Sequence, residues 1–210
     1  MTKCGVLLSG GLDSAVLLAD QATAGEVQPI YVTVGLAWEP AERAIVTSFL
    51  ASPTVRELHV RPLVTLGVDM RDVYDATHWA LEGRPPGYHT PDQDVYLPGR
   101  NVVLLGKAAV YCAAAHIDRL VIGTLAHNPF PDATPEFRLA MARALSLGLA
   151  SDLQIDPYHV WASQAANDPI QYAVDLDEIK QRHLIQRVAR IAGEYVVHNA
   201  RPFPVLGSPQ

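Results

Sequence analysis

The sequence predicts an α/β fold with a doubly wound, mainly five-stranded parallel sheet of Rossmann-like type and helices on both faces. Along residues 1–157, short apolar runs alternate with longer segments of helical periodicity, separated by glycine, proline and polar residues. Strands that alternate with helices form βαβ units with right-handed crossovers. Ligands of such sheets bind beyond the carboxyl ends of the strands, so we expect the chemistry in the loops that follow them.

The first half of the chain contains two strand–helix pairs. Residues 4–9 (CGVLLS) form an apolar run that ends at glycines, as expected for a buried strand. Residues 12–22 follow with apolar positions at helical spacing. The apolar run 30–34 predicts the second strand. Residues 39–51 predict the second helix, with Pro40 in its first turn, where the missing N–H leaves no helical bond unmade.

The second half continues the alternation. The run 55–63 (VRELHVRPL) predicts the third strand. Residues 99–117 predict a long helix, and 118–124 (DRLVIGT) predict the fourth strand directly after it. Residues 134–149 predict the last helix of this part, and 152–157 (DLQIDP) predict the fifth strand.

The composition is that of a globular protein. The 210 residues are 49% hydrophobic and 18% charged, and the formal net charge of −6 disfavours direct nucleic-acid binding, which needs a basic surface. No apolar run is long enough to span a bilayer, and Met1–Lys3 leads into a strand-like run rather than a signal peptide. We therefore expect a cytoplasmic protein without a membrane partner. Cys4 and Cys112 lie far apart, which predicts buried thiols rather than a disulfide or metal cluster.

The loop SGGLDS, from Ser9 to Ser14, joins the first strand to the first helix. Its glycines allow positive φ and close backbone approach, and the helix N-terminus offers N–H groups to an anion. No lysine follows the glycines, so the loop is not a Walker loop, and it does not match the dinucleotide fingerprint. The alternative is a plain turn in which a serine or aspartate caps the helix.

SGGLDS resembles the signature of the PP-loop ATP pyrophosphatases, which have the fold of the adenine nucleotide alpha hydrolases. The resemblance implies that this loop binds the β,γ-pyrophosphate of ATP, that a substrate oxygen is adenylated at the α-phosphorus, and that Mg²⁺ binds near Asp13. A helix N-terminus and Mg²⁺ would stabilise the leaving pyrophosphate. The implied ATP-binding residues are Ser9, Gly10, Gly11, Leu12, Asp13 and Ser14.

The loop 84–101 ends in YLPGRN and opens the long helix. Arg100 is a rigid bidentate donor suited to a phosphate or a carboxylate. Asn101 can cap the helix or bond a base edge. YLPGRN resembles the VPGRN segment of the 7-cyano-7-deazaguanine synthases, where it completes the nucleotide site. The alternative is a Pro-Gly turn followed by an incidental surface arginine.

The loop 123–137 (GTLAHNPFPDATPEF) leads into the last helix, with Thr134 as its expected N-cap. An acidic residue here can accept N–H groups of a guanine-type base or hold a proton during amide chemistry. Phe130 can stack on a planar base, and core packing is the alternative for it and the expectation for Phe137. The loop resembles the corresponding segment of the same synthases at Asn128, Asp132, Pro135, Glu136 and Phe137.

The chain also departs from that family. No cysteine follows Cys112, so the family's C-terminal four-cysteine zinc site is missing. After the second strand, VGLAWEPAE replaces the usual Tyr-Gly-Gln and Arg-His residues. We expect residues 1–157 to form the PP-loop catalytic domain and residues 158–210 to form a helical extension that packs on it or on a partner subunit.

The resemblance implies an ATP-dependent carbon–nitrogen ligase of queuosine-type 7-deazapurine biosynthesis, with ATP and Mg²⁺ as cofactors. It would adenylate 7-carboxy-7-deazaguanine or a similar carboxylate and transfer it to ammonia, giving the amide and then the nitrile. A paralogue that uses another amine or carboxylate, a regulatory module without turnover, and assembly as a homodimer stay open. The implied catalytic residues are Asp13, Arg100 and Asp132, and the implied substrate contacts are Arg100, Asn101, Asn128, Phe130, Asp132 and Glu136.

Overall fold

One parallel sheet organises the chain. The computed structural model describes residues 2–84, 86–87, 90–124 and 128–159. They contain a five-stranded, all-parallel sheet of order β3-β2-β1-β4-β5, which confirms the predicted Rossmann-like α/β fold. The strands are β1 (Thr2–Leu7), β2 (Gly25–Thr33), β3 (Val64–Gly67), β4 (Arg119–Thr124) and β5 (Gln154–His159). The strand order reverses at β1, which lies between β2 and β4.

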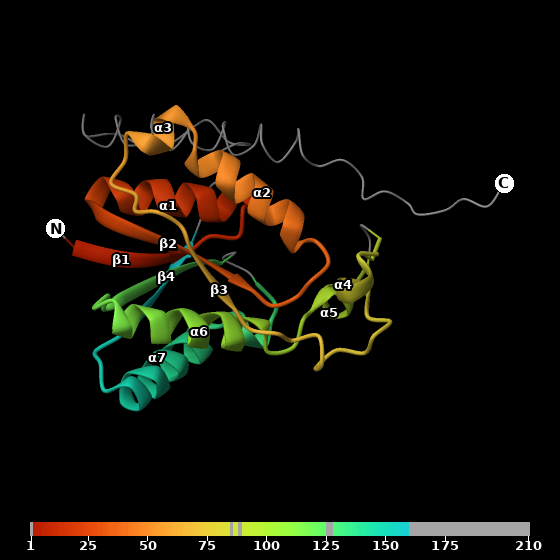
Figure 1. Cartoon of the computed structure of the whole chain (residues 1–210). Coiled ribbons are helices and arrows are strands. Elements are labelled where there is room, and N and C mark those ends of the chain that lie inside the picture. The colour runs from red at the N-terminus through yellow and green to blue at the C-terminus, as the bar shows by residue number, and fades with distance from the viewer. Residues whose placement is uncertain (1, 85, 88–89, 125–127, 160–210) are drawn as a thin grey trace, which may run out of the picture.

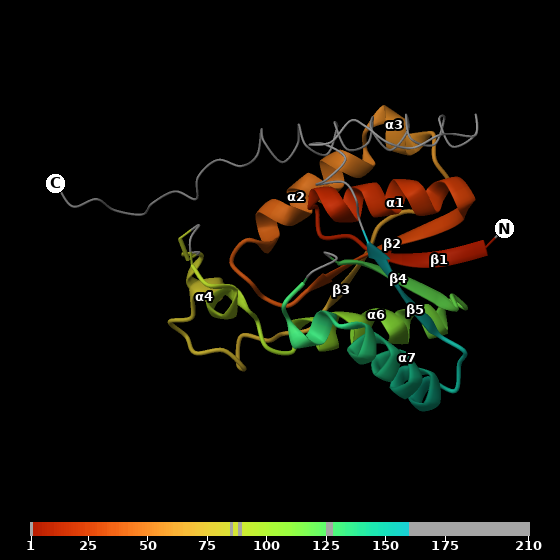
Figure 2. The ribbon, with the colours of Figure 1, turned by 180° about the vertical axis from the view of Figure 1, so that it is seen from behind.

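Helices cover both faces of this sheet (Figures 1 and 2). One face carries α1 (Leu12–Ala24), α2 (Glu39–Leu50) and the short α3 (Pro53–Arg56). The other face carries α6 (Arg100–Ala114) and α7 (Pro135–Leu149), with the 3-10 turn η1 (Pro131–Ala133) before α7. The short α4 (Trp79–Glu82) and α5 (Asp92–Val95) lie beyond the carboxyl ends of the strands. Within the described ranges, no helix has the length and apolar character needed to cross a membrane.

Each face of the sheet has its own hydrophobic core. The core beneath α1 and α2 includes Val6, Leu17, Val27, Val46 and Phe49. The core beneath α6 and α7 includes Ile30, Leu105, Ala109 and Leu120. Cys4 and Cys112 are free and buried in opposite cores, which confirms the expected buried thiols. Burial raises the pKa of Cys112 to about 12, so its thiol stays protonated at neutral pH.

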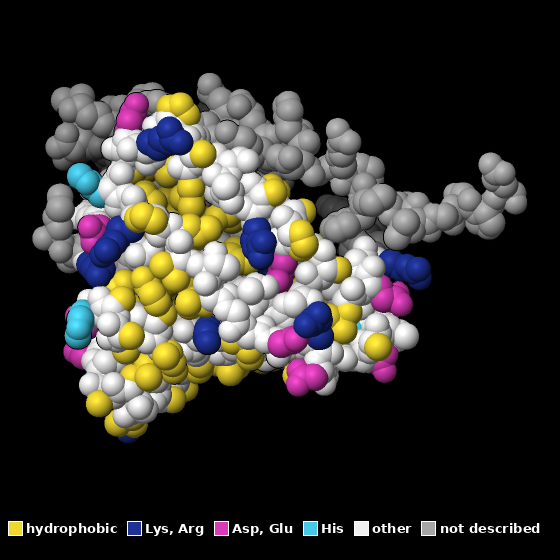
Figure 3. Space-filling model, in the orientation of Figure 1, with side chains coloured by type: hydrophobic (Ala, Val, Ile, Leu, Met, Phe, Trp, Pro, Cys, Tyr) yellow, Lys and Arg dark blue, Asp and Glu magenta, His cyan; other side chains and the backbone are white. Residues whose placement is uncertain are grey.

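The outer surface of α6 and α7 is apolar. Figure 3 shows hydrophobic side chains crowded over these two helices, with charged side chains more scattered elsewhere. Val110, Leu139 and Leu147 are 53%, 73% and 75% exposed. Among the described residues, no element covers this surface. The expected helical extension falls almost wholly in residues 160–210, which lie outside the described residues, and β5 runs on to His159, past the domain boundary expected at residue 157.

The third strand is not where the sequence predicts it. Residues 55–63 were expected to be extended, but Ser52 caps a helical turn, with Pro53 at its first position, that becomes α3. Within the predicted run, Val60 makes an isolated bridge to Val27. The pairing strand β3 follows it and aligns Val64 with Ile30 of β2. The error arose because a local capping signal outweighed the apolar pattern.

The carboxyl end of β2 is held by Glu39, the first residue of α2. Its Oε1 accepts the backbone N–H of Val34 at 2.7 Å, and its Oε2 accepts that of Gly35 at 3.3 Å and the hydroxyl of Thr33. Glu39 is only 6% exposed. This carboxylate therefore ties the start of α2 to the strand end beside the site.

Replacing Glu39 by alanine is expected to lower the free energy of unfolding by about 2–3 kcal/mol, because buried N–H groups lose their acceptor. Urea unfolding measures the difference. Alanine at the exposed Glu57, at the C-cap of α3, is the matched control and should change stability by less than about 0.5 kcal/mol. Equal effects of the two variants would contradict the role given to Glu39.

Candidate functional site

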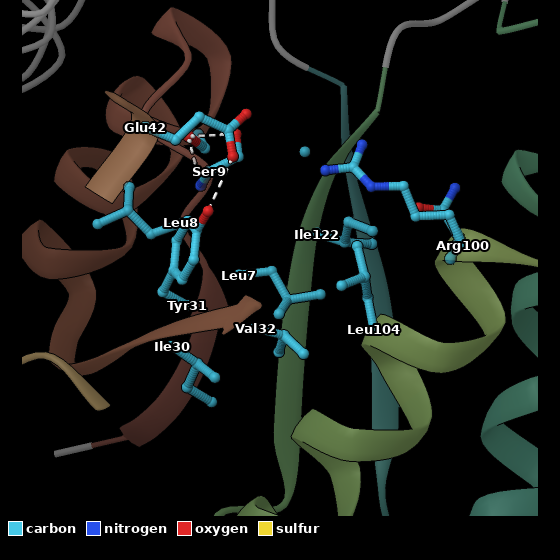
Figure 4. Close-up of a pocket in the computed structure, with 13 residues that line it drawn as sticks. Leu7, Leu8, Ser9, Ile30, Tyr31, Val32, Glu42, Arg100, Leu104 and Ile122 are labelled. Atoms are coloured by element: carbon cyan, nitrogen blue, oxygen red, sulfur yellow. Dashed lines mark hydrogen bonds between the residues drawn. The ribbon is translucent and has the colours of Figure 1, made fainter. Parts of the chain in front are cut away.

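A pocket opens at the carboxyl ends of β1, β2 and β4, between α2 and the start of α6 (Figure 4). Its volume is about 150 Å³. This is the point at which the strand order reverses, where ligands of such sheets bind. Its apolar lining includes Leu7, Ile30, Val32, Leu104 and Ile122. Its polar lining consists of Ser9, Ser14, Tyr31, Glu42, Arg100 and Asn101.

The serines of the first loop bond to the loop itself. The Ser14 hydroxyl donates to the carbonyl oxygen of Gly11 at 2.9 Å and accepts the backbone N–H of Ser9 at 3.2 Å. The two serine Oγ atoms lie 3.2 Å apart. These bonds preorganise the loop, because its shape is set by its own side chains. The implied contacts of the hydroxyls with ATP stay a prediction.

The glycines of this loop meet two separate needs. Gly10 has φ +80°, and a Cβ there would lie 3.1 Å from the carbonyl oxygen of Glu42 and 3.3 Å from Cγ2 of Val46. A side chain would therefore be strained and would press against α2. Gly11 is the N-cap of α1, and no side chain caps the helix. The alternative of a side-chain-capped turn is wrong, and the first N–H groups of α1 keep their capacity to bind an anion.

Asp13 lies in the first turn of α1, two residues after the glycines. Its side chain is half-buried, and this burial raises the pKa of its carboxyl group. Neither a hydrogen bond nor an ion pair engages the carboxylate within the described part of the chain. Among the described residues, no cluster of three or more histidine, cysteine, aspartate or glutamate side chains could hold a metal ion. Mg²⁺ commonly binds one or two carboxylates and completes its shell with phosphate and water oxygens, so Asp13 fits such an ion.

Arg100 and Glu42 face each other across the pocket (Figure 4). Arg100 begins α6, directly after Gly99, which has φ +75°. Its Nε is buried, and no hydrogen-bond acceptor for it exists among the described residues. The hydroxyl of Tyr31 donates to Oε2 of Glu42 at 3.0 Å on the opposite wall. Arg100 is thus not an incidental surface residue, because its guanidinium group points into the pocket with a donor to spare.

Asn101 and Asp132 join the second loop to the third. The backbone N–H of Asn101 donates to Oδ2 of Asp132 at 3.1 Å, and its side-chain amide donates to the carbonyl oxygen of Asp132 at 3.1 Å. Asp132 is 7% exposed and lies in η1, so its carboxylate bonds the first turn of α6. This brings Asp132 to the helix end that carries Arg100. Its implied part in the chemistry stays a prediction.

The other predicted substrate residues lie outside the pocket lining. Asn128 accepts the backbone N–H of Phe130 at 3.0 Å, which shapes the loop locally. The Phe130 ring stacks on Tyr96, with centroids 5.0 Å apart and planes 22° apart. Glu136 is exposed in the first turn of α7. Phe137 packs against the α6–α7 core, and Thr134 caps α7 at 3.1 Å, both as expected.

Sequence reasoning missed two pocket residues, Tyr31 and Glu42. Tyr31 belongs to a buried strand and Glu42 to an amphipathic helix, so each is typical of its element. The available signal was their position near the carboxyl end of the second strand, beside the glycine loop. Burial raises the pKa of Glu42 above its ordinary value, and the positive charge of Arg100 and the hydroxyl of Tyr31 offset only part of this rise.

A parallel sheet of this order, with a glycine loop that opens an uncapped helix across the pocket from an inward-pointing arginine, defines an α/β nucleotide-binding protein of the PP-loop type. The profile of the queuosine biosynthesis protein QueC family matches residues 3–183. The chain therefore belongs to the QueC family.

Three relatives of the chain carry the same name. A 7-cyano-7-deazaguanine synthase of Thermoplasma volcanium is 28% identical over 184 residues, covering 85% of this chain and 71% of the relative. That of Picrophilus torridus is 28% identical over 193 residues, covering 86% and 72%. That of Desulforamulus reducens is 30% identical over 169 residues, covering 73% and 71%. Most of the chain is thus similar to these synthases.

Proposed function

We propose that this protein is an ATP-dependent carbon–nitrogen ligase that converts 7-carboxy-7-deazaguanine to 7-cyano-7-deazaguanine. Adenylation of the carboxylate releases pyrophosphate, ammonia displaces AMP to give the amide, and a second activation gives the nitrile. Membership of the QueC family supports the reaction, and the uncapped N-terminus of α1, which faces Arg100 across the pocket, is the observation that carries the use of ATP. The protein would work in the cytoplasm, and a homodimer is compatible with this proposal.

The described residues divide this work between the two walls of the pocket. The N–H groups at the start of α1 would hold the departing pyrophosphate, and Asp13 would hold Mg²⁺, which neutralises phosphate charge when bound. Arg100 would bind the α-phosphate or the substrate carboxylate through its unpartnered Nε and its terminal nitrogens. Positioning and charge stabilisation would supply most of the rate acceleration.

The third loop would bind the deazapurine. Phe130 and Tyr96 offer two aromatic faces close to the start of α6, and a planar base can stack on either. Asp132 has a carboxylate oxygen, Oδ1, beyond the one that bonds Asn101, and this oxygen would accept N–H groups of the guanine-type edge. Asn128 and Glu136 would act at the periphery of this region.

A second candidate is a paralogue that passes the adenylated acid to another amine. The altered segment after β2 favours it, since Trp38 stacks on Trp79 with centroids 5.4 Å apart and Glu39 occupies the backbone N–H groups of Val34 and Gly35. A regulatory module without turnover is the third candidate, and the inward-pointing Arg100 speaks against it.

The test is incubation of the protein with ATP, Mg²⁺ and 7-carboxy-7-deazaguanine, with and without ammonia. Mass spectrometry follows AMP, pyrophosphate and the deazapurine. We expect AMP and pyrophosphate, with amide and nitrile only when ammonia is present. ADP and phosphate would contradict the PP-loop assignment. AMP without amide would favour the paralogue, and the absence of any nucleotide product would favour the regulatory module.

A further inference from the structure

The pocket has an apolar lining, and one of its walls carries a carboxylate that can accept hydrogen bonds. Leu7, Val32 and Ile122 contribute apolar surface from three adjacent strands. The Glu42 carboxylate stands on the α2 side and points toward this space (Figure 4). The opposite wall is cationic because of Arg100. A ligand that fits must be largely apolar on its faces and must present a hydrogen-bond donor to Glu42.

Glu42 is held in a defined orientation. The hydroxyl of Tyr31 bonds its Oε2 at 3.0 Å, and the Tyr31 side chain is only 3% exposed, so this anchor has little freedom. The backbone of Glu42 also lies against the glycine loop, since a Cβ on Gly10 would come within 3.1 Å of its carbonyl oxygen. The carboxylate is thus positioned relative to both the pocket and the loop.

We propose that Glu42 selects adenine over guanine, by accepting a hydrogen bond from the 6-amino group of a base lying on the apolar lining. This inference rests on the proposed use of ATP. Burial raises the pKa of Glu42, but the facing charge of Arg100 and the hydrogen bond from Tyr31 favour the ionised form. An ionised carboxylate only accepts hydrogen bonds, and adenine presents an amino donor where guanine presents a carbonyl acceptor. Guanine in the same orientation would leave two acceptors facing each other in a partly buried site. Tyr31 acts as a positioning residue for this contact.

The experiment measures nucleotide preference directly. Wild-type protein and the variants Glu42→Gln, Tyr31→Phe and Glu26→Gln are titrated calorimetrically, in the presence of Mg²⁺, with the α,β-methylene analogues of ATP and GTP. Glu26 is the matched control because it pairs with Arg61 near the amino end of β2, and both side chains are close to half exposed. Thermal unfolding of each variant checks that it is folded.

We expect the wild type to bind the ATP analogue about 10- to 100-fold more tightly than the GTP analogue. Glu42→Gln should narrow this preference by about tenfold, because glutamine can turn an N–H donor toward the guanine carbonyl. Tyr31→Phe should narrow it less, and Glu26→Gln should leave it unchanged.

Four outcomes would overturn the inference. Tight binding of the GTP analogue by the wild type would show that the pocket does not favour adenine. An equal loss of affinity for both analogues in Glu42→Gln would place the carboxylate near the ribose or the phosphates instead. Wild-type protein that binds neither analogue would overturn the proposed function as well, whereas an unaltered adenine preference in folded Glu42→Gln and Tyr31→Phe would overturn this inference alone.

Discussion

Replacing Arg100 by alanine is expected to lower kcat/KM for pyrophosphate release by about 1,000-fold, which is the scale seen when a cation that stabilises transferring phosphoryl charge is removed. The guanidinium group points into the pocket, and its buried Nε has no partner among the described residues. Removal of this side chain should therefore weaken the binding and reaction of the ligand far more than it lowers the stability of the fold. Release of pyrophosphate from ATP with 7-carboxy-7-deazaguanine is the measurement.

One further variant separates the geometry of Arg100 from its charge, and a second serves as a control at another arginine. Arg100→Lys keeps the charge but loses the planar fork, so it should recover only part of the lost activity. Arg61→Ala removes an exposed arginine that pairs with Glu26 and should leave kcat/KM unchanged. Full activity in Arg100→Ala, together with unchanged stability, would refute the assigned role.

The parts of the site that could be predicted are those written in contiguous residues. The loop from Ser9 to Ser14 can be recognised from the sequence because its glycines and hydroxyl residues directly follow a predicted strand. The start of α6 is similarly local, with Gly99 in the left-handed conformation before Arg100. The fold could be predicted from the strand–helix alternation for the same reason, because each element depends mainly on the hydrophobic pattern of its own residues.

The parts that could not be predicted depend on contacts between elements. Tyr31 and Glu42 are ordinary members of a strand and a helix, and only the packing of α2 on the sheet brings them together at the pocket. The sequence predicts a catalytic or substrate-binding role for Asp132, yet its hydrogen bond from the backbone N–H of Asn101 also gives it a structural role. A buried carboxylate in a loop that precedes a helix fits either role, and only its hydrogen-bond partners distinguish the two.

The misplaced third strand has the same origin. Residues 55–63 contain enough apolar residues to suggest a strand, but the Ser52–Pro53 start signal makes a helical turn first. The pairing segment is then set by which residues reach the edge of β2, and these are Val64 to Gly67. Register against a neighbouring strand is a long-range property that the local pattern does not contain.

Replacing Asp13 by asparagine is expected to lower the rate of pyrophosphate release by about 100- to 1,000-fold and to raise the Mg²⁺ concentration needed for half-maximal activity. Asparagine has nearly the same shape, so the turn at the start of α1 should persist while the charge is lost. Because no protein group engages the carboxylate within the described residues, its removal breaks no described hydrogen bond. Asp118→Asn, an exposed aspartate near the amino end of β4, is the matched control.

The pH dependence gives a second, independent reading of Asp13. Burial raises the pKa of its carboxyl group, so the proton is retained to a higher pH than on an ordinary aspartate. Only the ionised form can hold Mg²⁺, and kcat/KM reports the free enzyme. The acid limb of the wild-type profile should therefore lie above the ordinary aspartate range and should disappear in Asp13→Asn. An unchanged limb, or an unchanged Mg²⁺ requirement, would move the metal to other ligands and leave Asp13 as a residue that only shapes the first turn of α1.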